Sequence, residues 1–362
     1  MNKIFYRRPL ISTPVSPIIF KLPATAVSRK NQNVETIRGL AIILVVLGHM
    51  IGYTSTGGMR VGDDSIYRYV YYSLEYLRLP LFTVISGWVY ANKPIQLMDQ
   101  SKFIKGKLRR LILPMFVLST LLFLFRMITP GTNTTPEISD LPRNLIFPYD
   151  VYWYLFSLFL IFLTITVLDT KSFFHKPAGW CLALAGSFVL LFISENFLDA
   201  VPNLFSFKGA AYLFPFFLLG IGIFRYSEFL LNDKTTFAIL MVFITTLVIQ
   251  QVIWFGNFPV QEKHSILGMT VGISGVLLLF RLKPKNNLLI WIGSFAYGIF
   301  LFHVFFTGGS RILLLKLGIE NQLAILVLGV LCAVFFSILV EIVISKSRVL
   351  RFLFLGLKKE GK

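Results

Sequence analysis

Long apolar blocks, each followed by a short polar turn, recur along most of this chain. Blocks rich in Leu, Ile, Val and Phe run for roughly 17–22 residues, long enough to cross a bilayer core of about 30 Å. Only 14% of the 362 residues are charged, compared with about 25% in a typical soluble domain. The pattern predicts an all-α fold, a polytopic membrane helix bundle.

The polar turns divide the apolar sequence into about ten expected transmembrane helices. The helices cover approximately residues 35–53, 69–91, 109–129, 150–168, 178–196, 208–224, 236–254, 264–281, 288–306 and 322–345. We expect this membrane domain to span residues 34–346, between a disordered basic tail over 1–33 and a short basic tail over 347–362.

The net charge of +18 comes from Lys and Arg residues in the short turns rather than along one amphipathic face. With the amino terminus inside the cell, about 25 basic residues fall on the inner side and about 7 on the outer side, the asymmetry that sets membrane topology. "KFIKGKLRR" and "KSRVLRFLFLGLKK" are among the inner clusters. Both termini are therefore expected in the cytoplasm, and nucleic-acid binding is not expected.

Neither the cysteines nor the histidines have the spacing of a metal site. Cys181 and Cys332 lie inside apolar blocks, where a cysteine usually serves as a small buried hydrophobe. The four histidines show no i, i+4 pairing on an expected helix, so no metal is predicted.

The first expected helix carries two ionisable residues on one face. Arg38 lies at its inner boundary, and His49 follows eleven residues later. Eleven residues advance a helix by about 16.5 Å and leave only about 20° of rotation. Arg38 has the alternative role of reaching lipid phosphates, whereas an imidazole at the depth of His49 indicates a polar cavity.

Further polar residues are expected near the outer level of the bundle. Glu75 lies on the second helix, Asp150 and Trp153 open the fourth, and His303 lies near the outer end of the ninth. His264, which begins the eighth helix, has the ordinary alternative of a structural histidine at a helix end. Charged groups inside a membrane usually face a cavity or a partner.

A cationic cluster is expected at the inner level, where Lys107, Arg109 and Arg110 begin the third helix. The cluster anchors the topology, and beside Arg38 it could also bind a phosphorylated ligand from the cytoplasm. Arg78 lies mid-membrane and requires a counter-ion or a hydrated cavity, and Glu75 is within helical reach.

Six segments in order resemble acyltransferase family 3, the integral-membrane enzymes that modify bacterial surface carbohydrates. The segments are "IRGLAIILVVLGH", "RLPLFTVISGW", "RRLILP", "WYLFSLFL", "FFLLGIGI" and "IGSFAYGIFLFH". The family signature, an Arg and a His separated by ten residues, is matched by Arg38 and His49. The likeness covers about residues 34–346 and is nearest to the fucose 4-O-acetylase-like branch. Thr36, Arg78 and Phe300 depart from the residues common in the family.

The resemblance implies transfer of an acyl group, most often acetyl, from cytoplasmic acetyl-CoA to a sugar hydroxyl. Arg38, Lys107, Arg109 and Arg110 are then expected to hold the phosphates of CoA. His49 is expected to act as general base, with Glu75 or Asp150 fixing its tautomer. The expected donors to the developing oxyanion, or contacts to the substrate, are Arg78, Asp150, Trp153, Tyr297 and His303. Direct transfer and an acyl-His49 intermediate both remain open.

The expected acceptor is an O-antigen, a capsule, an exopolysaccharide or a lipid-linked glycan at the bacterial inner (cytoplasmic) membrane. Two other classes remain: a transporter or flippase for a sugar- or phosphate-bearing substrate, and a non-catalytic scaffold or sensor. The sequence lacks the paired broken helices in two matching halves that many transporters have. An assay for acetyl transfer separates the enzyme from both alternatives.

Overall fold

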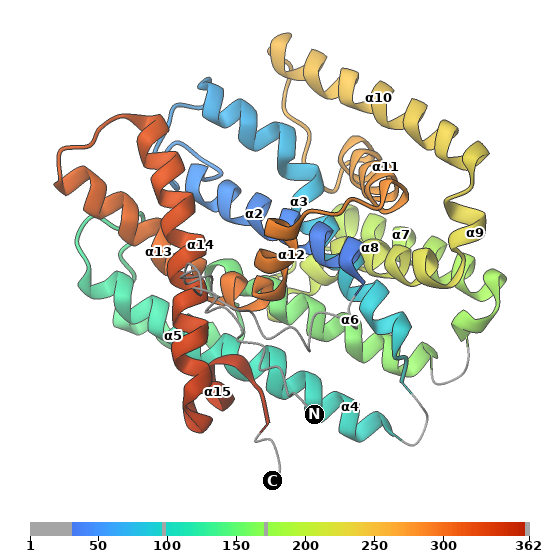
Figure 1. Cartoon of the computed structure of the whole chain (residues 1–362), viewed down its shortest axis with the longest axis horizontal. Coiled ribbons are helices and arrows are strands. Elements are labelled where there is room, and N and C mark those ends of the chain that lie inside the picture. Colours follow the sequence, from blue (N-terminus) through green and yellow to red (C-terminus); the bar gives the residue numbers. More distant parts are fainter. Residues whose placement is uncertain (1–30, 96–98, 170–172, 359–362) are drawn as a thin grey trace, which may run out of the picture. The chain divides into compact units, whose positions relative to one another are not determined.

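A computed structural model describes residues 31–95, 99–169 and 173–358 of the chain. These residues form helices joined by short loops, with no β-strand among them (Figure 1). The expected all-α fold is confirmed. Residues Gln32–Lys362 make up one compact unit, and the tail predicted over 1–33 lies almost entirely outside the described residues.

The described residues of the first half of the chain contain five long helical segments. They are α2 (Gln32–Ile51), α3 (Ile66–Asn92), the continuous segment α4 (Gln100–Lys107) to α5 (Leu113–Ile128), α6 (Trp153–Asp169) and α7 (Pro177–Phe197). A π-helical turn over Leu108–Ile112 joins α4 to α5, and 3-10 helices cover Ile138–Leu145, Asp150–Tyr152 and Phe173–His175.

From Phe173 to Lys358, the structure shows five more long helices and three short ones after α7. They are α8 (Phe207–Arg225) with the 3-10 turn Leu204–Ser206 before it, α9 (Ser227–Leu230), α10 (Asp233–Phe255), α11 (Ile266–Leu282), α12 (Asn287–Ser294), α13 (Ala296–Lys316), α14 (Gln322–Lys346) and α15 (Arg348–Leu355).

The described helices support a polytopic membrane bundle. Among the described residues, eight helical segments are long and apolar enough to cross a membrane, and α11 with α12 makes up to nine. The 27-residue α3 is not one of them, because Arg68, Glu75, Arg78 and several tyrosines lower its apolar content. At about 1.5 Å per residue it nevertheless extends over about 40 Å, enough for the second crossing that we predicted.

The ninth expected helix is wrong in its boundaries. We placed it over 288–306, but α12 ends at Ser294 and α13 continues to Lys316. The α11 and α12 axes are bent by 118°, and Lys283 between them adopts a left-handed conformation (φ 47°). Helix α12 is therefore a short segment after the bend, and α13 is the next helix long enough to cross a membrane.

Helices α2 and α8 form the centre of the bundle. Both are mostly buried; α2 packs against α3, α12, α13 and α14, and α8 packs against α3, α6 and α7. Two glycines allow α3 and α8 to pack closely. A Cβ on Gly87 would collide with the Phe217 carbonyl, and a Cβ on Gly220 would collide with the Val84 carbonyl. Small residues permit this kind of backbone approach in membrane proteins.

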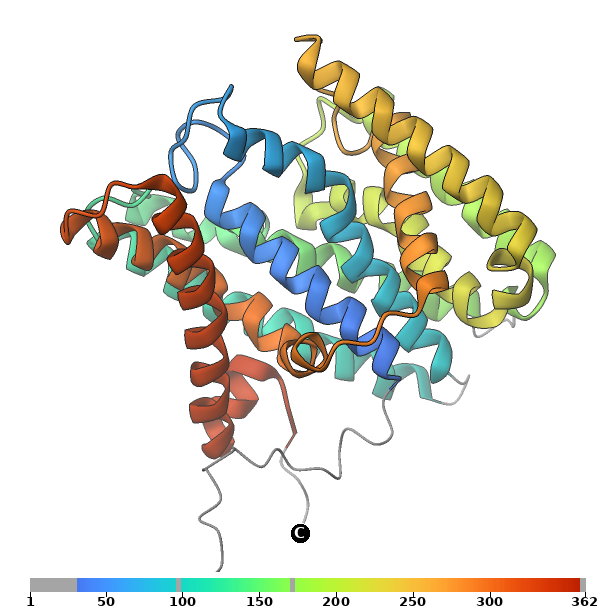
Figure 2. The same ribbon diagram turned by 45° about the horizontal axis from the view of Figure 1, so that its top comes forward.

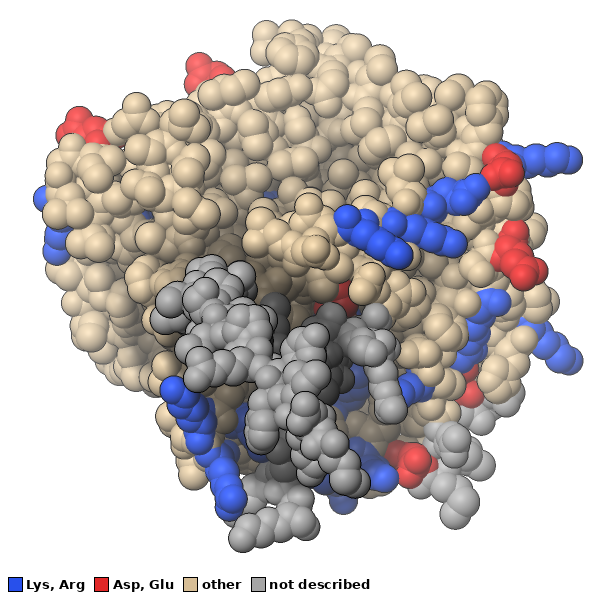
Figure 3. Space-filling model, viewed as in Figure 1, with Lys and Arg blue, Asp and Glu red and all other residues tan. Residues whose placement is uncertain are grey.

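The periphery of the bundle is apolar. Helix α10 lies at its edge beside α11, as Figure 2 shows, and buries only Gln250. Large side chains such as Phe237, Val252 and Phe255 are exposed on it. In Figure 3 much of the visible surface is uncharged, while Lys and Arg gather toward its lower and right-hand parts. This distribution suits a surface that faces lipid.

Candidate active site

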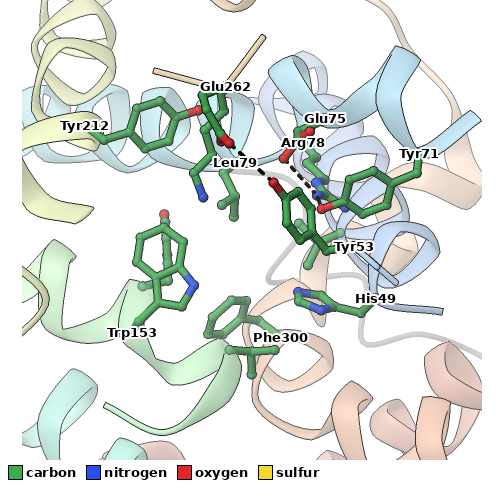
Figure 4. Close-up of a pocket in the computed structure, with 14 residues that line it drawn as sticks. His49, Tyr53, Tyr71, Glu75, Arg78, Leu79, Trp153, Tyr212, Glu262 and Phe300 are labelled. Atoms are coloured by element: carbon green, nitrogen blue, oxygen red, sulfur yellow. Dashed lines mark hydrogen bonds and ion pairs between the residues drawn. The ribbon is translucent and has the colours of Figure 1, made fainter. Parts of the chain in front are cut away.

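A cavity of about 340 Å³ surrounds the exposed side of His49 at the carboxyl end of α2. Helices α2, α3, α6, α8 and α13 contribute to its wall, together with the turn before α11 (Figure 4). The lining residues are Val45, His49, Tyr53, Tyr71, Glu75, Arg78, Leu79, Val151, Trp153, Tyr154, Tyr212, Glu262, Lys263 and Phe300. Four of the residues that the sequence singled out, His49, Glu75, Arg78 and Trp153, therefore meet here.

The His49 ring lies beside the ring of His303 from α13, with 5.1 Å between the ring centroids. His303 is fully buried, and its Nδ1 is 3.0 Å from the Ile299 carbonyl and 2.9 Å from the Phe300 carbonyl. Because both partners are acceptors, Nδ1 carries the proton. Nε2 of His303 has no hydrogen-bond partner among the described residues and is left as a proton acceptor.

One face of α3 supplies Tyr71, Glu75 and Arg78 to the cavity, since residues three, four and seven apart lie on one side of a helix. Arg78 donates to the Tyr71 hydroxyl and lies 3.9 Å from the Glu75 carboxylate. A Cβ on Gly48 would overlap the Arg78 guanidinium. Gly48 therefore lets this cation lie directly against α2, next to His49.

Opposite α3, the cavity is lined by aromatic rings and by the turn before α11. The Lys263 ammonium is 5.2 Å from the centre of the Trp153 ring and 5.7 Å from that of Tyr212. The Tyr53 hydroxyl is 3.5 Å from Glu262. Burial lowers the pKa of the Lys263 ammonium below its ordinary value, although the Glu75 carboxylate opposes this shift.

A second cavity, of about 280 Å³, shares His49 and Tyr53 with the first. Asp150 lies here and forms an ion pair with Arg126. Asp150 has a left-handed backbone conformation (φ 51°) at the start of the turn that leads into α6. That turn separates Asp150 from Trp153, so the two residues line different cavities.

The predicted phosphate-binding residues lie away from the lining of both cavities. Arg38 is 2.7 Å from Glu35 on its own helix. The Lys107 ammonium lies 3.4 Å from the centre of the Phe162 ring, and Arg109 Nε donates to the Gly356 carbonyl over 2.8 Å.

Tyr297 also belongs to this second group of residues. Its hydroxyl donates to the Arg110 carbonyl, and the Arg110 guanidinium lies 5.4 Å from its ring centre. Tyr297 thus joins the cationic segment and is not among the residues that line the His49 cavity.

Several lining residues were not singled out in the sequence, chiefly Tyr71, Tyr212, Glu262 and Lys263. With Tyr53 and Tyr154, four of the fourteen tyrosines in the chain line the cavity. Nothing in their spacing along the sequence distinguishes them from the other ten. Glu262 and Lys263 belong to the turn before α11, whose composition is that of any polar loop. Only their depth in the fold identifies them.

The chain is similar in sequence to known proteins. A family model described as an acyltransferase domain matches residues 31–346. The nodulation protein NolL of Sinorhizobium fredii is 27% identical over 194 residues, which are 51% of this chain and 46% of NolL. The chain thus aligns with about half the length of this relative. No solved structure shows significant similarity to the chain.

Proposed function

The chain belongs to acyltransferase family 3, and from this membership we propose that it transfers an acetyl group from acetyl-CoA to a sugar hydroxyl of a bacterial surface or exported glycan. The family match supports a multi-pass membrane acyltransferase. The proposed reaction rests on the cavity of about 340 Å³ in which His49 lies among aromatic rings, carboxylates and cations.

The proposed acceptor is a carbohydrate because of the chemistry of the lining. Trp153, Tyr212 and Phe300 offer flat apolar surfaces for the C–H faces of a sugar ring. Glu75, Glu262 and Lys263 supply acceptors and a donor for its hydroxyl groups. Pockets that combine aromatic walls with a few convergent polar groups are typical of small-molecule sites.

In the proposed reaction His49 is the general base. It removes the proton from the acceptor hydroxyl while the hydroxyl oxygen attacks the thioester carbonyl of acetyl-CoA. The C–S bond then breaks, and the CoA thiolate takes up the proton that His49 carries. His303, 5.1 Å away between ring centroids, is the neutral acceptor that holds the His49 ring in one orientation.

Arg78 is the proposed donor to the negative charge that develops on the carbonyl oxygen. A guanidinium has five N–H donors, and the contacts with Tyr71 and Glu75 involve one nitrogen, Nη2. A preorganised donor of this kind stabilises the transition state without moving, and loss of one typically costs about 10²–10³ in rate.

The donor is proposed to approach from the opposite end of α2. Arg38, Lys107, Arg109 and Arg110 provide cations for the phosphates of CoA, and the Arg109 guanidinium is anchored by its Nε bond to the Gly356 carbonyl. Charge-assisted bonds from arginine to phosphate are short and strong. The Lys and Arg distribution supports a cytoplasmic location for this end in the bacterial inner membrane.

The test is acetate release from glycan made by four strains. Wild type, His49→Ala and Arg38→Ala are expressed at equal membrane levels in a host without its own surface O-acetylation, with Gly186→Ala as a control outside the site. Base-labile acetate is measured by proton NMR, and isolated membranes are assayed with radiolabelled acetyl-CoA. We expect label on glycan with wild type and the control only. Acetate that persists in His49→Ala would contradict the proposed base.

A further inference from the structure

A third hollow, of about 610 Å³, lies between α7 and α11 and is not part of the His49 cavity. Both helices pack against α8, so the hollow is a groove between neighbouring helices. Phe188, Leu191 and Phe192 line it from α7, and Met269 and Ile273 from α11. Phe192 is 60% exposed, so the groove opens at the surface that faces lipid.

The groove is polar at one end. Glu195 and Asn196 at the carboxyl end of α7 lie beside His264 and Ser265 before α11. His264 Nε2 is 3.0 Å from a Glu195 carboxylate oxygen, which joins the two walls. Seven residues separate Phe188 from Glu195, about 10.5 Å along a helix. The groove therefore has an apolar length and a polar head, as a membrane lipid has.

One tight turn separates the polar end of the groove from the His49 cavity. The Ser265 amide donates to the Glu262 carbonyl over 2.9 Å, and the Ser265 hydroxyl caps α11 at the Gly268 amide over 3.1 Å. Within this turn Glu262 and Lys263 line the His49 cavity, while His264 and Ser265 line the groove. Four consecutive residues thus border both spaces.

We infer that the groove holds the apolar chain of a glycolipid whose sugar head is the acyl acceptor in the His49 cavity, an inference that rests on the proposed function. Within a bilayer an apolar groove offers a hydrocarbon chain little beyond what lipid offers. The groove would instead position the substrate. With the hydrocarbon chain in the groove, the linkage to the sugar would lie beside His264 and Asn196. The sugar would then extend past the turn toward His49.

The experiment uses membranes that contain the full-length protein and the native acceptor, with radiolabelled acetyl-CoA as the probe. Labelled product is passed over a phenyl matrix in aqueous buffer, which retains molecules with an apolar chain. Thr270→Trp and Ile273→Trp fill the groove from α11. Leu190→Trp is the matched control, because Leu190 is 45% exposed on α7 and is absent from the groove lining.

The inference predicts that the phenyl matrix retains the label until mild hydrolysis releases the sugar head. Both groove variants are expected to reduce the initial rate about tenfold, a typical effect of obstructing one apolar subsite, while Leu190→Trp stays near wild type. Size-exclusion profiles of the solubilised variants confirm folding, and the milder Ile273→Phe should give an intermediate rate.

Other outcomes overturn the inference in distinguishable ways. Label on a glycan without an apolar chain means that the acceptor is not a glycolipid. Retained label with equal rates in groove and control variants means that the groove holds bulk lipid. No label on any glycan with wild type, in membranes that contain the acceptor, removes the proposed function itself and with it this inference.

Discussion

His49 on α2 and His303 on α13 lie with their ring centroids 5.1 Å apart and their planes inclined by 49°. The Nδ1 proton of His303 is committed to two backbone carbonyls, so only Nε2 remains to accept a bond. The sequence predicts that Glu75 or Asp150 fixes the tautomer of His49. In the structure Glu75 lies 3.9 Å from Arg78, and Asp150 forms an ion pair with Arg126.

Replacing His303 by leucine is expected to lower kcat by about two orders of magnitude, within the range for a group that serves acid–base catalysis. KM for acetyl-CoA should change little, because His303 does not contact the donor in the proposed reaction. His303→Gln, which retains a side-chain oxygen acceptor, should recover part of the rate. Steady-state kinetics on purified enzyme measure the split, and equal losses in both variants would argue against a positioning role.

Gly48→Ala tests whether Arg78 must lie against α2. Alanine normally stabilises a helix interior by roughly 0.5–1 kcal/mol relative to glycine, but here its Cβ would overlap the Arg78 guanidinium. We expect a loss of kcat approaching about 10²-fold with KM nearly unchanged. Gly186→Ala on α7 is the control, since its Cβ meets nothing within 4 Å. kcat and KM are measured for both variants at matched protein levels. An unchanged kcat in Gly48→Ala would contradict the requirement that Arg78 lie against α2.

Asp169 carries a buried network whose loss should destabilise the fold. Arg225 donates to both its carboxylate oxygens, over 3.2 and 3.1 Å, and the Tyr90 hydroxyl donates over 2.7 Å. Asp169→Ala leaves the Arg225 cation unpaired, which typically costs about 3–5 kcal/mol. Thermal unfolding in detergent should show a large fall in Tm. Asp140→Ala removes an exposed pair with Arg143 and should cost less than about 1 kcal/mol.

Lys263 should make stability depend on pH in a predictable direction. Burial lowers its pKa in the folded protein, so the unfolded chain binds this proton more tightly. Stability then rises with pH between the folded pKa and the ordinary lysine value of about 10.4. Lys263→Met is therefore expected to raise Tm at neutral pH, by an amount that shrinks as pH approaches that value. A Tm difference that grows with pH would contradict this sign.

Most of the helices could be predicted from the sequence, because the thickness of the bilayer sets the length of the apolar segments that cross it. The ninth helix could not be placed. The apolar run through Trp291 and Phe300 is continuous in composition, and hydropathy does not register the interruption at Phe295 between α12 and α13. The polar α3 shows the converse, since a helix can extend through a bundle without the composition of an isolated span.

The candidate site was predictable where depth alone marks a residue. His49, Glu75 and Arg78 attract notice because charge is costly in hydrocarbon. Trp153 and Asp150 look equivalent in sequence, yet the turn over Asp150–Tyr152 sends them into different cavities. Tyr297 precedes His303 by six residues, about 9 Å along the axis, and so lies toward the Arg110 end. Such separations depend on turns and helix ends, which hydropathy does not encode.

Thr36 stands where an acidic residue is common in the family, and the structure gives it a partner. Its hydroxyl accepts a bond from the Asn286 amide, 250 residues away in sequence, and the Asn286 side chain in turn caps α12 at Leu289. A side chain of α2 therefore satisfies a backbone amide at the bend between α11 and α12. During synthesis, α2 must wait in the membrane for most of the chain to emerge before α12 finds its place. A chain that stops after α11 would leave one side of α2 without its neighbours α12, α13 and α14.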